Sequence, residues 1–187
     1  VAAAAVRATG RRVSIVDFDV HHGNGTEEIF ARDGGVQVIS LHQFPFYPGS
    51  GAATSIGEGN GRGAIINIPL PEASAGPEYK LAMRRLVVPA LRRFAPDVIL
   101  VSAGFDAHED DRTASQHVST AGFGRLAALL FALADRFGVT GGGRPPAGPG
   151  GAQPIPPSGN FSPATPPPAP PVTSPTPAPA PPAPAAP

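Results

Sequence analysis

Short apolar runs alternate with amphipathic stretches over the first three quarters of the chain. Four of these runs are rich in β-branched residues and too short for buried helices: residues 13–18, 36–41, 65–68 and 98–102. Such runs are typical of strands that are covered on both faces of a sheet. Pro69 follows the third run and is expected to end that strand. The pattern therefore predicts four buried strands.

Helices are predicted around these strands. The Ala-rich residues 2–5 are typical of the last turns of a helix, and residues 26–31 are expected to form a short one. A longer helix is expected to begin where Thr120 caps it and to run to about residue 137. Strands that alternate with helices predict an α/β fold with a mainly parallel sheet. In such sheets, ligands bind beyond the carboxyl ends of the strands.

The stretch 77–94 has apolar residues at helical spacing, with basic residues mostly elsewhere. We expect Pro89 to bend or split this helix, because proline lacks the N–H that the helix needs there. The apolar positions that define its expected inner face are Leu81, Leu86, Val87 and Leu91.

Composition changes sharply near Gly138, which predicts a domain over residues 1–138 and a tail over 139–187. The tail is rich in Pro, Ala and Gly, and Arg144 is its only charged residue. Such a segment buries too little apolar surface to offset its ordering entropy, so we expect a disordered tail with polyproline II character. An unknown partner with an aromatic-lined groove could bind the prolines of the tail. A solvated tail without a partner is the stronger expectation.

Charge and composition narrow the classes of function. The 14 basic and 14 acidic residues cancel, so no direct binding to nucleic acid is expected. No apolar stretch approaches the roughly 20 residues of a membrane helix, so no membrane span is expected and a cytoplasmic location is the default. The chain has no cysteine, so any metal must be held by Asp, Glu, His or backbone oxygen.

Polar residues gather where the first predicted strand ends. Asp17, Asp19 and His21 are spaced two apart, and alternate residues of an extended chain share a face. Carboxylate oxygens and an imidazole nitrogen together suit Zn²⁺. The competing interpretation is an Asp-rich loop in which His21 and His22 make ordinary hydrogen bonds.

A second acidic residue follows the fourth predicted strand. Asp106 comes shortly after that strand, and Gly104 allows a close approach of the backbone. Together with Asp19 and His21, Asp106 completes three protein ligands and leaves the open position that a catalytic zinc ion needs. Alone, such an aspartate is often only a helix cap.

The loop after the second predicted strand is rich in aromatic residues and proline. It contains Phe44, Phe46, Tyr47 and Pro48. These side chains could form an apolar slot beside the metal. Packing of Phe44 and Phe46 under the loop is an equally good interpretation.

Four segments in this order resemble motifs of the histone deacetylase and acetylpolyamine amidohydrolase superfamily, closest in style to its class II and bacterial members. They are residues 17–26 (DFDVHHGNGT), 40–42 (SLH), 46–51 (FYPGSG) and 102–107 (SAGFDA). The resemblance covers roughly residues 11–137. It implies an arginase-like, three-layer α/β fold, present here in part, and hydrolysis of acetyl-lysine in proteins or of acetylpolyamines.

The resemblance also implies roles for single residues. Asp19, His21 and Asp106 would bind zinc, with His22 beside them. A monovalent cation, K⁺, would be held by Asp17 together with Ser40 and Leu41, partly through backbone carbonyls. The substrate tunnel would be lined by Tyr47 with its neighbours Phe46 and Pro48.

Two catalytic groups of the family, the general base and the oxyanion donor, are missing from the sequence. The family takes its base from a His-His pair upstream of the zinc strand, and its oxyanion donor from a Gly-Gly-Tyr turn downstream. The only tyrosines here are Tyr47 and Tyr79. We therefore expect a fragment without catalytic residues that is inactive in isolation.

Two other functions are considered. One is a non-catalytic protein that binds a metal or a partner, with the tail as a docking segment. The absence of the His-His base and of the Gly-Gly-Tyr donor is consistent with this function. Residues 106–110 (DAHED) resemble the Asp-Ala-His-x-Asp metal motif of the arginase-type ureohydrolases, but the second Asp-rich motif of that family is absent.

Overall fold

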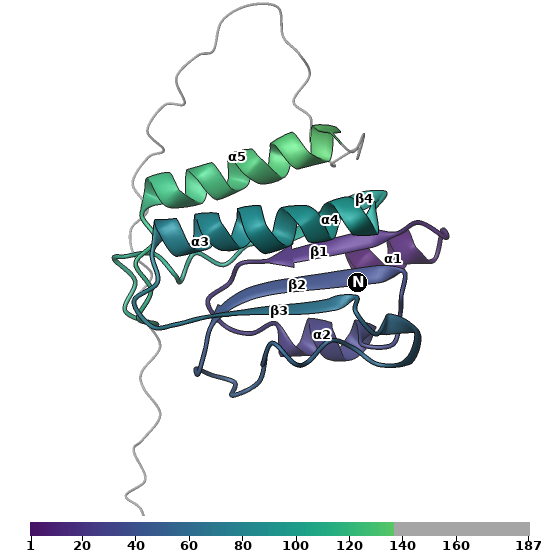
Figure 1. Cartoon of the computed structure of the whole chain (residues 1–187), viewed down its shortest axis with the longest axis horizontal. Coiled ribbons are helices and arrows are strands. Elements are labelled where there is room, and N and C mark those ends of the chain that lie inside the picture. Colours follow the sequence, from purple (N-terminus) through teal and green to yellow (C-terminus); the bar gives the residue numbers. More distant parts are fainter. Residues whose placement is uncertain (137–187) are drawn as a thin grey trace, which may run out of the picture. The chain divides into compact units, whose positions relative to one another are not determined.

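The computed structural model describes residues 1–136. Their centre is a parallel sheet of four strands in the order β3-β2-β1-β4 (Figure 1). The strands are β1 (Val13–Asp17), β2 (Val36–Gln43), β3 (Ile65–Leu70) and β4 (Val98–Ser102). All four predicted strands are present, and the predicted α/β class with a parallel sheet is confirmed.

Helices cover both faces of the sheet, which gives three layers. In Figure 1, α3, α4 and α5 lie on one side and α2 on the other. The helices are α1 (Ala2–Arg7), α2 (Asn24–Phe30), α3 (Gly76–Ala82), α4 (Val88–Phe94) and α5 (Thr120–Arg136), with a short 3₁₀ turn at Gly59–Gly61.

The alternation of side chains along the strands divides the core into two clusters. Val16 and Ile39 pack with the helices α3 to α5, whereas Val13 and Val38 pack with residues of α1 and α2. Every residue of β1 and β2 is buried. Strands covered on both faces read as continuous apolar runs, which explains why the sequence pattern located them.

Strand β3 runs two residues beyond the predicted end. Pro69 lies inside β3, where it is paired in register with His42 of β2. Among the described residues, β3 is an edge strand. Proline is tolerated in edge strands because the missing N–H can fall on the side without a partner. The prediction that Pro69 ends the strand was therefore wrong.

The predicted helix 77–94 is divided into three parts. Between α3 and α4, residues Met83–Val87 form a π-turn. Pro89 lies in the first turn of α4 and has no N–H to donate to the carbonyl of Arg85, so the ladder is interrupted in the preceding turn. The predicted division at proline is confirmed.

The inner face of this helix differs from the predicted one. Val87 and Leu91 are buried as expected, but Leu81 and Leu86 are 59% and 49% exposed. The π-turn changes which positions share a face. The buried positions are Tyr79, Ala82, Met83, Val87, Ala90, Leu91 and Phe94.

Helix α5 is capped by the residue before the predicted one. Ser119 Oγ accepts a hydrogen bond from the N–H of Gly122 at 3.2 Å, and Thr120 is the first helical residue. The hydroxyl of Thr120 instead contacts His108 Nε2 at 2.8 Å.

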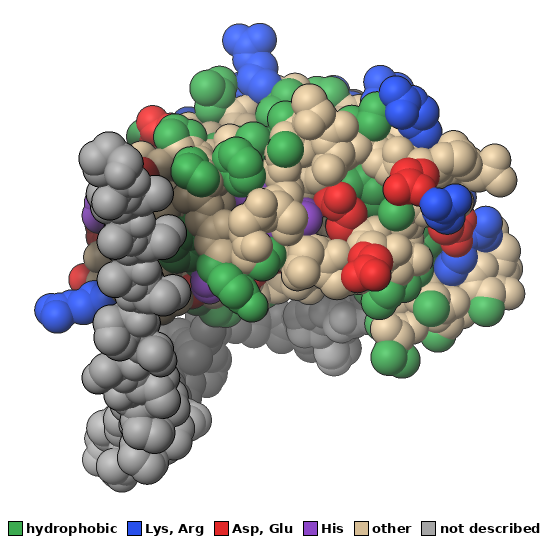
Figure 2. Space-filling model, turned by 90° about the horizontal axis from the view of Figure 1, so that it is seen from below, with side chains coloured by type: hydrophobic (Ala, Val, Ile, Leu, Met, Phe, Trp, Pro, Cys, Tyr) green, Lys and Arg blue, Asp and Glu red, His purple; other side chains and the backbone are tan. Residues whose placement is uncertain are grey.

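The predicted domain boundary at residue 138 and the predicted tail lie outside the described residues. No helix in the described part of the chain is long and apolar enough to span a membrane. The face seen from the side of α2 carries hydrophobic, acidic and basic side chains without a large area of one charge (Figure 2).

Candidate metal centre

The segments that follow β1 and β4 leave the same edge of the sheet side by side. The two strands are parallel neighbours, with Asp17 opposite Ser102. The pairing continues past the strands, because the N–H of Phe18 donates to the carbonyl of Ser102 at 3.1 Å. The N–H of Val20 then donates to Asp106 Oδ1 at 2.9 Å. These bonds bring the acidic residues of both segments to one place.

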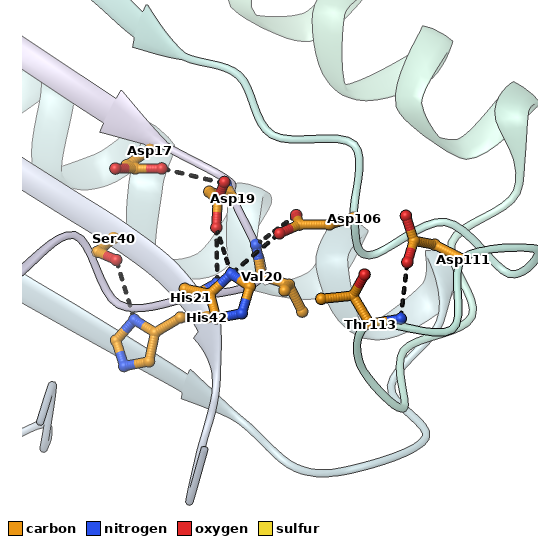
Figure 3. A network of polar contacts seen from close by, with 9 residues as sticks. All are labelled: Asp17, Asp19, Val20, His21, Ser40, His42, Asp106, Asp111 and Thr113. Carbon is orange, nitrogen blue, oxygen red and sulfur yellow. Dashed lines mark hydrogen bonds and ion pairs between the residues drawn. The ribbon is translucent and has the colours of Figure 1, made fainter. Parts of the chain in front are cut away.

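Asp19, His21 and Asp106 form a compact group there (Figure 3). His21 Nδ1 lies 3.0 Å from Asp19 Oδ1 and 3.0 Å from Asp106 Oδ2. The N–H of His21 also donates to Asp19 Oδ1 at 2.8 Å, which fixes the carboxylate against its own loop. The three side chains singled out in the sequence thus point at a common centre.

The geometry of this group fits a zinc ion. Ligands about 2.1 Å from a tetrahedral ion lie about 3.4 Å from one another, and the His21 nitrogen is already close to that distance from both carboxylates. Two carboxylates and one imidazole form a donor set that Zn²⁺ accepts. The three side chains are 21% to 38% exposed, so a fourth position is open to solvent.

Gly104 allows the close approach that the group requires. A Cβ at this position would lie 2.6 Å from Asp19 Cγ and 2.7 Å from Asp19 Cα. Real Cβ atoms do not show such distances, so any larger residue would push Asp19 away from Asp106. The expectation that Gly104 permits a close approach is confirmed.

Asp17 lies behind this group rather than in it. Its carboxylate is 4% exposed and accepts a hydrogen bond from the N–H of Asp19 at 3.1 Å (Figure 3). Burial raises the pKa of Asp17 to about 6, against a hydrogen bond from Ser102 that lowers it. On its other side, Asp17 is paired in register with Ser40 of β2.

Ser40 is oriented by His42. His42 Nε2 lies 2.9 Å from the carbonyl oxygen of Gly51, which only accepts, so this nitrogen carries the proton. Burial lowers the pKa of His42, so the ring is neutral and Nδ1 is an acceptor. The hydroxyl of Ser40 therefore donates to Nδ1 at 2.9 Å and keeps its own lone pairs free (Figure 3). The side chain of Leu41 is buried in the core, so only its backbone can contribute to a site at this edge.

His22 is buried in a hydrogen-bond network that the sequence did not reveal. Its Nε2 lies 2.9 Å from Glu27 Oε2, and its Nδ1 lies 2.8 Å from Ser50 Oγ. Asn67 Nδ2 donates to the same Glu27 oxygen at 2.7 Å. The network joins the segment after β1 to α2, β3 and the loop after β2. Ser50 belongs to the 46–51 motif, but nothing in the sequence linked it, Glu27 or Asn67 to His22.

The aromatic loop packs beside the metal centre. The ring of Phe46 stacks on His21 with 5.3 Å between centroids, and the edge of Tyr47 meets the same ring at 6.1 Å. Phe46 also packs against the core, as the second of the two interpretations expected. Tyr47 is 76% exposed. Pro48 follows at partial burial.

The remaining candidates lie apart from the group of three. His108 contacts Thr120 and is not one of the converging side chains. Tyr79 is fully buried in α3, and its hydroxyl has no hydrogen-bond partner among the described residues. Burial, and then the charges of Asp106 and Asp19, raise the pKa of Tyr79 above its usual value.

The chain is similar to known proteins in sequence. A family model described as "Histone deacetylase domain" matches residues 1–144. The chain is 46% identical over 120 residues to "Histone deacetylase 10, chloroplastic" of Oryza sativa subsp. japonica. This match covers 64% of this chain and 27% of that protein. It is 43% identical over 137 residues to the "Histone deacetylase-like amidohydrolase" of Pseudomonas aeruginosa, which covers 72% of this chain and 36% of the relative.

A solved structure agrees with these relatives. The crystal structure of an acetylpolyamine aminohydrolase from Burkholderia pseudomallei matches with a TM-score of 0.68 and 41% identity, over 71% of this chain and 39% of that one. The match therefore spans between 27% and 39% of the length of these three proteins.

Proposed function

Because the chain belongs to the histone deacetylase family, we propose that it forms the zinc-binding part of a deacetylase that hydrolyses acetyl-lysine or acetylpolyamine amides. The family and its α/β fold, both predicted from the sequence motifs, are confirmed. The ligands in this proposal are Asp19, His21 and Asp106. The observation that carries it is the convergence of their three ligand atoms within 4.8 Å of one another.

The chain's own residues would hold both the metal and the substrate. Zinc, when bound, supplies a Lewis acid that polarises an amide carbonyl and lowers the pKa of a bound water. Asp106 is fixed for its role by the N–H of Val20, and Asp19 by the N–H of His21. Tyr47, with Phe46 and Pro48, would flank the aliphatic stem of the acylated side chain.

A monovalent cation, K⁺, belongs to the same proposal. Asp17 and Ser40 lie opposite each other on neighbouring strands. The Ser40 hydroxyl donates its hydrogen bond to His42, so the lone pairs of Ser40 Oγ remain free to bind a cation. With the backbone of Leu41, they would form an oxygen-rich site behind the zinc ligands. Its role would be to hold the segment after β1 in place.

Hydrolysis by this chain alone is expected to be negligible. His22, His42 and His108 are each engaged in hydrogen bonds, and Tyr79 is buried. None of them is free to act as the base or the oxyanion donor of the reaction. Loss of a donor alone costs roughly two to three orders of magnitude in rate. This supports a second candidate, a metal-binding protein without catalysis.

Zinc binding by the purified chain tests the central proposal. Isothermal titration is expected to give one zinc ion per chain, and the variants Asp19→Ala, His21→Ala and Asp106→Ala should each weaken binding at least tenfold. The matched control is Asp110→Ala, because that side chain is 90% exposed and outside the group. Equal binding by wild type and all three variants would refute the assignment.

Activity is measured separately, so that the two candidates can be told apart. The zinc-loaded chain is incubated with an acetyl-lysine peptide and with an acetylpolyamine. Zinc binding without turnover is the result that both candidates predict for this chain, whereas turnover would exclude the non-catalytic candidate. Turnover that disappears in His21→Ala would instead show that the described residues suffice for the reaction.

A further inference from the structure

Hollows with apolar and basic lining lie on the surface between the helices of one layer. Figure 1 shows α5 running alongside α3 and α4. Two hollows of about 220 and 390 Å³ lie between these helices, and both are lined by Arg84 and Leu129. Because they share these two lining residues, the hollows lie next to each other along the helices, and together they are called the groove. Its apolar lining includes Met83, Val88, Val118, Leu126, Leu129 and Leu133.

The groove follows the helical repeat on both sides. On one side, Lys80, Arg84, Val88 and Arg92 line it at intervals of four residues. On the other, the lining runs from Gly122 to Leu133 along one face of α5. Eleven residues of helix correspond to about 16 Å, or about three turns. The groove thus has the length and the spacing of a short helix.

Every charged residue that lines the groove is basic. They are Lys80, Arg84, Arg92 and Arg125. All four side chains are exposed, and none has an ion-pair partner among residues 1–136, where the only Arg pairs are those of Arg7 and Arg32. An apolar floor between positively charged edges is complementary to an apolar stripe flanked by carboxylates.

We propose that this groove docks an acidic amphipathic helix of about three turns from a partner protein. The chain's own residues 138–187 contain no Asp or Glu, so they lack the complementary charge. The hollows open to solvent along the helices, whereas a small lipid or metabolite is normally enclosed over most of its surface. Charges spaced by one helical turn match the side chains of a helix better than a single head group.

A designed peptide tests the proposal with the full chain. The probe is a synthetic helix of about three turns with leucines at positions i, i+4 and i+7 and glutamates beside them, labelled for fluorescence anisotropy. We expect saturable binding that is at least about tenfold weaker when the glutamates are replaced by glutamines. The double variant Arg84→Glu, Arg125→Glu should lose binding by at least the same factor.

The matched control is Arg62→Glu, an exposed arginine outside the groove, whose binding should stay within about twofold of wild type. A second variant, Leu129→Gln, tests the apolar floor and should also weaken binding. Circular dichroism and an unchanged zinc affinity show that each variant is folded.

Three results would overturn the proposal. The first is equal binding of the glutamate and glutamine peptides, or binding that survives the charge reversal. The second is binding of the chain to vesicles of anionic phospholipid but not to the peptide, which would assign the groove to a membrane surface. The third is self-association in sedimentation velocity that is lost in the double variant, which would make a second copy the occupant.

Discussion

The buried carboxyl group of Asp17 makes the stability of the fold depend on pH. Its pKa of about 6 in the ion-free fold lies above the 3.8 of an unperturbed aspartate. The folded chain therefore binds this proton more tightly than the unfolded chain, and the resulting stability is complete below about pH 4. It is lost as pH rises from about 4 to about 6, and the loss amounts to roughly 3 kcal/mol.

Replacing Asp17 by Asn should remove this dependence on pH. In chelator and tetramethylammonium buffer, the free energy of unfolding of Asp17→Asn relative to wild type should increase between pH 4 and pH 7. Added potassium should stabilise wild type more at pH 7 than at pH 4.5, because the cation replaces the proton, and should leave Asp17→Asn unaffected. A difference between the two proteins that is constant with pH would contradict the assigned pKa.

Gly104 is a second residue on which the metal centre depends. Gly104→Ala places a methyl group against Asp19 and should move its carboxylate away from Asp106. We expect zinc affinity to fall at least tenfold, measured by isothermal titration. The control is Gly124→Ala in α5, where a Cβ meets nothing within 4 Å. That change should leave zinc binding intact and stabilise the helix by about 0.5–1 kcal/mol.

At the scale of elements, two histidines anchor the aromatic loop. His22 forms a hydrogen bond with the side chain of Ser50, and His42 forms one with the carbonyl of Gly51. These bonds attach consecutive loop residues to the segment after β1 and to β2. Ser50→Ala removes the first tie and leaves a buried ring nitrogen without a partner, which costs about 1 kcal/mol. Amide hydrogen exchange across residues 44–51 should therefore become faster.

Ser55→Ala is the control for this prediction. Ser55 makes its hydrogen bonds through its backbone: its N–H donates to the carbonyl of Ala52 at 2.9 Å, and its carbonyl accepts from Asn67 Nδ2 at 3.1 Å. Alanine keeps both backbone groups. Exchange in residues 44–51 should then match wild type. Unchanged exchange in Ser50→Ala would mean that packing of Phe46 on His21, rather than the hydrogen bond, holds the loop.

The sequence located the elements whose pattern depends on burial alone. Strands β1 and β2 are buried along their whole length, and their runs rich in β-branched residues were visible in the sequence. The sequence-based predictions were wrong where tertiary structure determines whether a residue is tolerated or buried. Pro69 is tolerated because β3 lies at an edge, and Leu81 is exposed because a π-turn changes the helical phase.

The candidate site was predictable for a related reason. Parallel strands deliver their carboxyl ends to one edge, so two acidic motifs far apart in sequence could be expected to meet. Glu27, Ser50 and Asn67 could not be identified in this way. Their contacts depend on how a helix, a loop and a strand are placed around His22, which no local spacing encodes. The groove between α3, α4 and α5 was not predictable for the same reason, because residues of several elements line it together.

At the scale of the whole molecule, the two edges of the sheet differ in character. Edge strand β3 contains Pro69, which weakens pairing with a further strand. Strand β4 has no such protection. Among residues 1–136 it pairs only with β1, its sequence is VILVS, and Val101 is 46% exposed. An apolar strand with free backbone groups along one side is a template for pairing with another chain.

Association of the purified chain should therefore depend on β4. Val101→Lys places a charge on this strand at an exposed position, and we expect sedimentation velocity to show a larger fraction of monomer than for wild type. Leu81→Lys is the matched control, because Leu81 is more exposed but lies on α3. If strand pairing drives association, Leu81→Lys should change the monomer fraction little. An equal effect of both substitutions would instead assign association to general burial of apolar surface, since only the pairing mechanism distinguishes a strand edge from a helix surface.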